Sequence, residues 1–260
     1  MRIIILSDVH ANLAALEAVL RHAEEGGAVD GVWGLGDSVG YGPQPVECVS
    51  RLREADATLV AGNHDRAATG MMGVEEFNQD AAAAALWTRG RLSHEDAAFL
   101  NALPEVTGAT GEPGPGQTAG RPVQFTLVHG TLRRPVWEYL YTHDAALAHL
   151  KRQRTAFGLV GHTHVPMLAV EGEQYPQGCE LYRLQDGDRI ELRDDLKLVI
   201  NPGSIGQPRD GDPRAAYALY DTASASVTIN RVEYDIAATQ ALMAEASLPR
   251  WLIERLAEGR

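Results

Sequence analysis

The chain has little cysteine, no long apolar run and a shortage of positive charge. Only two cysteines, Cys48 and Cys179, occur among 260 residues, and they lie far apart. This excludes a disulfide framework and is typical of reduced thiols in a cytoplasmic protein. No apolar run approaches the roughly 20 residues that a membrane-spanning helix needs, so no membrane contact is expected. The first residues resemble a strand rather than a basic leader, so no signal peptide is expected.

Acidic residues outnumber basic ones, 35 against 23, and the formal net charge is -12. Such a surface repels polyanions, and no run of Lys or Arg suggests a nucleic-acid footprint, so no stable nucleic-acid binding is expected. A phosphate substrate is not excluded, because a cluster of divalent cations reverses the local field whatever the global charge.

Five short apolar runs predict buried strands, at residues 2–6, 30–35, 57–61, 123–128 and 156–160. Helical patterns at 12–26 and 46–53 separate the first three. This β-α-β-α-β order is typical of a parallel sheet with helices packed on its faces. Further helices are expected at 74–102, with a break at Ser93, and at 143–151.

Short alternating runs later in the chain predict antiparallel hairpins, at residues 166–170, 180–184, 189–192, 196–200, 214–220 and 226–233. We therefore expect a second sheet, built from the C-terminal part and facing the first. The predicted fold class is α/β, a four-layer α/β/β/α sandwich of two facing mixed sheets with helices outside.

One domain is expected to span residues 1–260. Residues 108–121 carry five glycines and two prolines, which predicts a flexible insertion. Residues 235–260 predict two helices broken at Pro249. Their apolar side chains either cover the core or make a contact between subunits, so a homo-oligomer is left open.

The five predicted strands share one feature, which is that each is followed within a few residues by side chains able to bind a metal ion. In chain order these are Asp8 and His10, Asp37, Asn63 with His64, His129, and His162 with His164. Ligands of open α/β sheets bind at the carboxyl ends of the strands. We therefore expect these side chains to converge.

Carboxylate oxygen, amide oxygen and imidazole nitrogen together favour borderline transition metals such as Mn, Fe, Co, Ni or Zn over Mg or Ca. A pair of metal ions needs a bridging carboxylate, and Asp37, which follows Gly36, is the natural candidate. The sequence therefore predicts a centre of two divalent ions, with manganese as the favoured metal.

The segments DVHAN, GDSVGYGP, GNHD, VHG and GHTH, in this order, resemble the five motifs of the calcineurin-like metallophosphoesterases. The resemblance extends from residue 1 to about residue 205. The stretch NPGSIGQPR, at 201–209, resembles compact bacterial members of that family, including phosphodiesterases of the YfcE type.

The resemblance implies a role for each motif residue. Asn63 would neutralise charge on the phosphoryl oxygens. His64 would be a catalytic histidine that binds no metal and protonates the leaving oxygen or stabilises its charge, and Asp65 would orient its imidazole. One metal would be bound by Asp8, His10, Asp37 and His164, and the other by Asp37, Asn63, His129 and His162.

The implied activity is hydrolysis of small phosphate mono- or diesters by a metal-bridging hydroxide, with His64 as general acid and diesters as the favoured class. Two alternatives stay open. One is a Ser/Thr protein phosphatase, which uses a similar site. The other is a non-catalytic interaction scaffold, which the complete ligand set disfavours.

Three residues are candidates for substrate binding. Arg209 follows a glycine-rich turn and either reaches phosphate or forms a structural salt bridge. Tyr41 either shapes the pocket rim or belongs to a simple turn. Arg133 precedes Trp137 and Tyr139, and this set suits nucleotide or aryl ester binding or else surface packing. The remaining histidines are expected to face solvent, namely His22, His94, His143 and His149.

Overall fold

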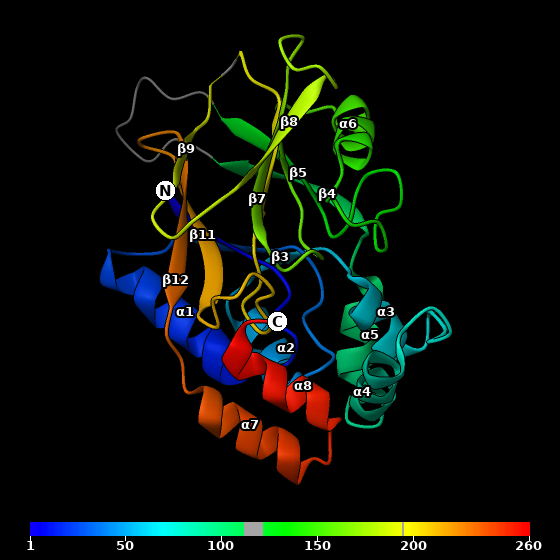
Figure 1. Ribbon diagram of the computed structural model, residues 1–260. Helices are drawn as coiled ribbons and strands as arrows, with labels where there is room; N and C mark the ends of the chain where they lie inside the picture. The colour runs from blue at the N-terminus through cyan, green and yellow to red at the C-terminus, as the bar shows by residue number, and fades with distance from the viewer. Residues whose placement is uncertain (112–121, 194) are drawn as a thin grey trace.

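Twelve strands form two six-stranded sheets in the computed structural model, which describes residues 1–111, 122–193 and 195–260 (Figure 1). The first sheet runs, in spatial order, β3 (Thr58–Leu59), β2 (Gly31–Gly34), β1 (Arg2–Leu6), β11 (Ala215–Asp221), β12 (Ser226–Val232) and β9 (Arg189–Glu191). The second runs β4 (Val106–Gly111), β5 (Val123–Val128), β6 (Phe157–Leu159), β10 (Leu198–Pro202), β7 (Pro166–Glu171) and β8 (Cys179–Arg183).

Each sheet combines a parallel and an antiparallel part. Strands β1, β2 and β3 pair in parallel, and so do β5, β6 and β10. The expectation that the second sheet comes from the C-terminal part alone is wrong. After Arg2, strand β1 is apolar and buried, and it has a neighbour on each side. It pairs in parallel with β2 and antiparallel with β11, in which Leu219 lies opposite Ile4. Strands β5 and β6 therefore belong to the other sheet.

Alternation along β1 shows how the layers form. Ile3 and Ile5 face the second sheet, whereas Ile4 and Leu6 face helix α1 (Leu13–Glu25). Helix α2 (Pro45–Glu54) packs beside α1, and α6 (His143–Arg152) covers the outer face of the second sheet (Figure 1). The predicted α/β/β/α sandwich is confirmed.

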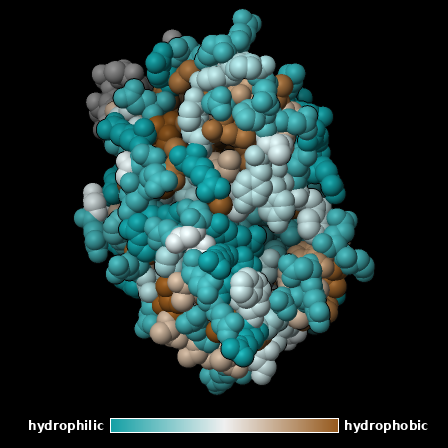
Figure 2. Space-filling model, viewed as in Figure 1, coloured by the Kyte–Doolittle hydropathy of each residue, from teal (hydrophilic) through white to brown (hydrophobic). Residues whose placement is uncertain are grey.

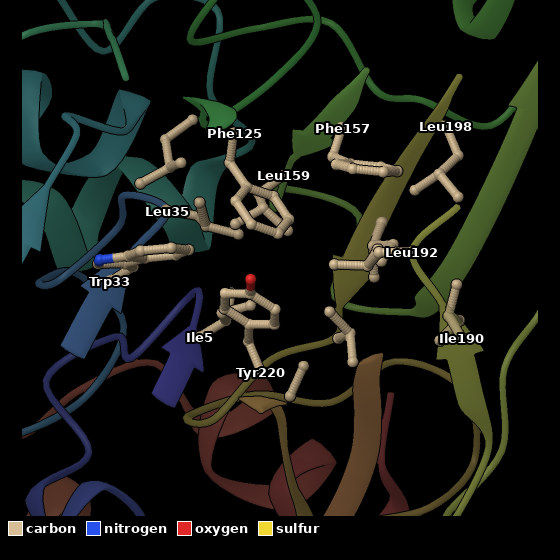
Figure 3. Packing of buried hydrophobic residues seen from close by; sticks show 14 of the residues in the cluster. Ile5, Trp33, Leu35, Phe125, Phe157, Leu159, Ile190, Leu192, Leu198 and Tyr220 are labelled. Atoms are coloured by element: carbon tan, nitrogen blue, oxygen red, sulfur yellow. The ribbon is translucent and has the colours of Figure 1, made fainter. Parts of the chain in front are cut away.

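Aromatic rings fill the space between the sheets (Figure 3). The ring of Phe125 lies 5.3 Å from that of Trp33, 5.1 Å from that of Tyr220 and 5.7 Å from that of Phe157, measured between centroids. Rings from both sheets therefore pack together in one core. This packing fixes the position of one sheet, and of its strand ends, relative to the other.

The remaining helices lie at the end of the sandwich where the parallel strands finish (Figure 1). They are α3 (Asn63–Thr69), α4 (Gln79–Arg89), α5 (His94–Ala102), α7 (Ile236–Glu245), α8 (Arg250–Glu254) and the 3-10 helix η1 (Arg255–Glu258). The breaks at Ser93 and Pro249 are confirmed, because these residues cap α5 and α8. Helix α3, which begins at the GNHD motif, was not predicted.

The expected insertion at 108–121 is partly wrong. Residues Val106–Gly111 form β4, and residues 112–121 lie outside the described residues. Gly111 is needed there, because a Cβ atom on it would lie 2.2 Å from the ring of Tyr220.

No helix in the described part of the chain is long and apolar enough to cross a membrane. The face seen in Figure 2 is mostly hydrophilic, with apolar areas over the C-terminal helices.

Replacing Phe125 by Ala should lower the free energy of unfolding by about 3–5 kcal/mol, because the cavity would lie between two sheets that cannot close on it. Urea unfolding followed by circular dichroism measures the change. Tyr182→Ala is the control, because that side chain is 42% exposed, and its effect should stay within about 0.5 kcal/mol. A loss below about 1 kcal/mol for Phe125→Ala would contradict the interlocked core.

Candidate metal centre

The two sheets bring the ends of their parallel strands to one place. The loops after β1, β2 and β3 meet those after β5 and β6, and the side chains there are at most 3% exposed. All seven predicted ligands lie in this cluster, namely Asp8, His10, Asp37, Asn63, His129, His162 and His164. The sequence-based expectation of convergence is met for every one of them.

The ligands form two groups that share Asp37. Its Oδ2 lies 3.3 Å from Nε2 of His129 in one group and 3.7 Å from Nε2 of His10 in the other. The first group contains Asp37, His129 and His162, and the second contains Asp8, His10 and His164. A third group, His10, Asp37 and His64, overlaps both. Asn63 Oδ1 lies 3.2 Å from Nε2 of His129 and so joins the first group. Asp37 therefore has the position that a bridging carboxylate requires.

Backbone carbonyl groups fix the tautomer of each histidine. A carbonyl oxygen only accepts hydrogen bonds, so the ring nitrogen that contacts it carries the proton, and in the neutral imidazole the other nitrogen carries a lone pair. The donating contacts are His10 Nδ1 to Val39 at 3.1 Å, His129 Nδ1 to Leu35 at 2.7 Å, His164 Nδ1 to Gln207 at 2.6 Å, and His162 Nε2 to Trp137 at 3.1 Å.

The four lone pairs then face one another in pairs. Nε2 of His10 lies 3.1 Å from Nε2 of His164, and Nε2 of His129 lies 3.0 Å from Nδ1 of His162. Two neutral acceptors cannot hydrogen-bond to each other. The buried carboxylate oxygens beside them, Asp8 Oδ1 and Asp37 Oδ2, also lack a hydrogen-bond partner in the described residues. A cation in each group satisfies all of these atoms, so the residues fit a pair of metal ions.

The electrostatics of the cluster also call for positive charge. Burial alone would raise the pKa of Asp37, but neighbouring histidines, His129 first, hold it far below its ordinary value. Burial lowers the pKa of His129, yet Asp37 outweighs burial and raises it to about 9, so without a cation beside Asp37 this ring takes up a second proton on Nε2. Burial, followed by the charge of His129, lowers the pKa of His162 to about 3. The carboxylates thus hold positive charge at the centre of the site, which is what a bound cation supplies.

The ligand loops are tightly folded. The backbone φ angle is positive at Asp8 (53°), His10 (48°), Asp37 (54°), His162 (65°) and His164 (60°). Residues other than glycine rarely adopt this left-handed backbone conformation, so backbone strain is concentrated at the predicted metal ligands. A Cβ atom on Gly62 would lie 2.0 Å from Oδ1 of Asp37, so only glycine fits in the GNHD turn.

His64 lies beside the metal ligands and is enclosed by rings. Its backbone N–H donates to Asp37 Oδ1 at 2.8 Å. Its imidazole lies 4.3 Å from the ring of Tyr41, 4.8 Å from that of Phe77 and 4.9 Å from that of His10. Burial lowers the pKa of His64 to about 4, although Asp37 opposes the shift. Its Nδ1 has no hydrogen-bond partner in the described residues.

The expected contact between Asp65 and the imidazole of His64 does not form. Asp65 occupies the third position of α3, and its carboxylate turns back to the start of that helix. Oδ2 accepts a hydrogen bond from the N–H of Gly62 at 3.0 Å, and Oδ1 accepts one from the N–H of Val39 at 3.2 Å. Asp65 therefore joins two ligand loops, and packing by neighbouring rings orients His64.

A cavity of about 80 Å³ opens beside His64 and the ligands. Tyr41 and Arg209 line it, together with Phe77, Trp137 and Tyr139. Phe77 was missed in the sequence, where a lone aromatic residue before a helix carries no signal. The ring of Tyr139 stacks on that of His162 at a centroid distance of 4.0 Å. One wall of the cavity is therefore aromatic.

Arg133 does not reach this cavity. Its Nη2 is held 2.6 Å from Glu138 Oε1 and 2.8 Å from Asp144 Oδ2, which keeps the guanidinium on its own loop.

The expectation that His149 faces solvent is wrong. Its ring is fully buried, accepts a hydrogen bond from the N–H of Leu132 and contacts Gln153 Oε1 at 3.1 Å.

Comparison with known proteins agrees with this geometry. Residues 1–225 match the model of the calcineurin-like phosphoesterase superfamily domain. A metallophosphoesterase of known structure from Sphaerobacter thermophilus is 45% identical with a TM-score of 0.82, over 100% of this chain and 99% of that chain. An uncharacterized protein from Methanocaldococcus jannaschii is 38% identical over 99% of this chain and 98% of its own. A hypothetical protein from Pyrococcus horikoshii, 21% identical, shares the fold with a TM-score of 0.74, over 100% of this chain and 98% of that chain.

Asp37→Asn should lower the occupancy of both metal positions, because the shared carboxylate is replaced by a neutral amide of the same size. Metal content per chain, measured by plasma mass spectrometry after manganese loading and desalting, should fall from near two to below one. Asp144→Asn makes the same chemical change on a side chain that is 80% exposed, and it should leave the metal content unchanged. Full occupancy in Asp37→Asn would show that this carboxylate is not shared.

Proposed function

Because the chain belongs to the calcineurin-like phosphoesterase superfamily, we propose that it hydrolyses small phosphate esters, preferentially diesters, with two divalent metal ions. The observation that carries this proposal is the pairwise approach of histidine ring nitrogens beside carboxylate oxygens that have no hydrogen-bond partner among the described residues. Manganese is the proposed metal, since it accepts the mixture of oxygen and nitrogen ligands found here. When bound, the two ions supply Lewis acidity toward phosphoryl oxygens and lower the pKa of water.

His64 and Asn63 give the chain its own part in the reaction. The imidazole of His64 lines the cavity beside the two pairs of histidines, His10 with His164 and His129 with His162, so it is placed to donate a proton or hydrogen bond to the leaving oxygen. The amide of Asn63 lines the same cavity and is placed to stabilise charge on a phosphoryl oxygen. The three rings around His64 limit its rotation, which favours one direction of donation.

The aromatic wall supports a small organic ester as substrate. Phe77 and Trp137 lie 5.2 Å apart, ring to ring, and Phe77 also meets His64 edge to face. An aryl or nucleoside group of an ester can stack on this wall, close to the proposed proton donor. The cavity has a volume of only about 80 Å³, and this favours a small molecule over the phosphorylated segment of a protein.

A panel of substrates tests the function directly. With manganese, bis(p-nitrophenyl) phosphate should give a higher kcat/KM than p-nitrophenyl phosphate, cyclic nucleotides or a phosphoserine peptide. Chelation should abolish turnover and added manganese should restore it. Failure of the metal-loaded protein to hydrolyse any of these esters would refute the proposed function. The highest kcat/KM for the phosphopeptide would indicate a protein phosphatase instead.

His64→Ala should keep both metal ions and lose about 10²–10⁴-fold in kcat on an ester with a poor alkoxide leaving group. The loss should be much smaller for p-nitrophenolate, which leaves without a proton. His94→Ala is the matched control, because His94 is exposed at the start of α5. Equal losses on both classes of ester would remove His64 from the role of proton donor.

A further inference from the structure

The ring of Tyr139 lies flat against the ring of a candidate metal ligand, His162. The two centroids are 4.0 Å apart, and the two planes are 5° from parallel. In the described part of the chain, the other rings outside the ligand set that contact these histidines belong to Tyr41 and His64, which meet the ring of His10 at 61° and 86°. Tyr139 is 44% exposed and His162 is 3% exposed, so Tyr139 covers one face of a ligand that is itself buried.

His162 differs from the other three candidate histidines in the nitrogen that faces the metal position. Its Nδ1 lies 3.0 Å from Nε2 of His129, whereas its Nε2 donates to the carbonyl of Trp137. The other three, His10, His129 and His164, donate through Nδ1 and present Nε2. The lone pair of Nε2 points roughly along the bond that joins the ring to the side chain, whereas that of Nδ1 points nearly at right angles to it. Rotation about this bond therefore turns Nδ1 away from the metal more than it turns Nε2, so a ring that binds through Nδ1 needs its plane held.

The segment that carries Tyr139 is itself fixed. Glu138 lies between Trp137 and Tyr139, and its carboxylate accepts hydrogen bonds from Nη2 of Arg133 at 2.6 Å and from the hydroxyl of Thr131. Arg133, which does not reach the cavity, therefore holds the residue between the two that contact the imidazole. One of these two fixes the edge of the imidazole through its carbonyl, and the other fixes its face through its ring.

Tyr141 supports Tyr139 from the same segment. Its ring stacks on that of Tyr139, with a centroid distance of 5.6 Å and an interplanar angle of 22°. Its hydroxyl donates to the carbonyl of Thr163 at 2.7 Å, and Thr163 is the residue that follows His162. Tyr139 is thus held against His162 by a neighbour that is hydrogen-bonded to the same ligand loop.

We propose that Tyr139 is a positioning residue for one of the two metal positions. Its ring fixes the plane of the His162 imidazole, and this keeps Nδ1 turned toward Asp37 and His129. The other metal position, whose histidines present Nε2, does not depend on Tyr139. This inference rests on the proposed function in needing two metal ions, but it concerns the binding of the ions and not the ester.

Manganese binding to the metal-free protein, measured by calorimetry, tests this role without any substrate. In Tyr139→Ala the affinity for one of the two ions should fall about tenfold, because loss of a group that orients a metal ligand has effects on this scale, and the affinity for the other ion should be unchanged. Tyr139→Phe should keep both affinities, since the ring remains, whereas Tyr139→Leu should behave like Tyr139→Ala. Tyr182→Ala is the matched control, because that side chain is 42% exposed and lies on β8, and it should change neither affinity.

Double variants identify the metal position that is affected. His162→Ala and His164→Ala each remove a ligand from one position and leave the other position complete. Adding Tyr139→Ala to His164→Ala should weaken binding at the complete position about tenfold, whereas adding it to His162→Ala should change nothing there. The melting temperature of each metal-free variant separates lost positioning from lost folding, and it should match that of the parent protein.

Unchanged manganese binding in Tyr139→Ala would overturn the proposal, and a raised KM in that variant would then make Tyr139 a wall of the cavity only. Equal weakening of both ions, or weak binding in Tyr139→Phe, would overturn it as well. The outcome is independent of the test of activity. Selective weakening of one ion in a protein that hydrolyses no ester keeps the positioning role and loses the proposed function. Hydrolysis by the wild-type protein with unchanged metal binding in Tyr139→Ala keeps the proposed function and loses the positioning role.

Discussion

The close approach of histidine ring nitrogens is the constraint on which the rest of the site depends. It exists because four carbonyl groups, on three separate loops, each accept the proton of one ring on the side away from its neighbouring histidine. Leu35 and Val39 flank Asp37, so the loop that supplies the shared carboxylate also sets the tautomers of His10 and His129. Ligands and their supports thus come from the same short segments, and neither can shift without the other.

The turn at 201–209 stabilises the strained ligand loops by hydrogen bonds. The hydroxyl of Ser204 donates to the carbonyl of Asp8 at 2.9 Å, and the side chain of Asn201 donates to the carbonyl of Gly161 at 2.7 Å. The N–H of His162 donates to the carboxylate of Asp8 at 3.0 Å, which links the two sheets directly. The left-handed backbone at the ligands therefore persists because hydrogen bonds from several directions hold it. This turn also carries Arg209, so the segment that stabilises the ligand loops also forms part of the cavity wall.

The sequence allowed the strands and ligands to be predicted, because both are local signals. A run such as RIIIL indicates a strand buried on both faces, and a polar residue at its end stands out. The sheet to which a strand belongs is not a local property. Strand β1 pairs with residues more than two hundred positions away, and nothing in its own composition identifies that partner.

The same limit applies to single side chains. His149 follows the helical pattern of α6 as an exposed polar residue would, and only the packed structure shows that Gln153 and the backbone of Leu132 satisfy it in the interior. The contact expected between Asp65 and His64 failed because the helix N-terminus offered Asp65 closer donors.

The distribution of charge connects the candidate metal centre with Arg209, which lines the cavity beside it. An acidic chain repels a phosphoester over most of its surface, so attraction must come from a few places where positive charge is not cancelled. Arg231 shows the cancelled case, because Asp210 pairs with it. Arg209 lines the cavity beside the candidate metal ligands, and its hydrogen-bond partners in the described residues are the neutral side chains of Gln207 and Tyr41. For the proposed hydrolysis of phosphate esters, the cavity is therefore the place where positive charge, from Arg209 and from bound cations, can attract a small anion to an otherwise acidic chain.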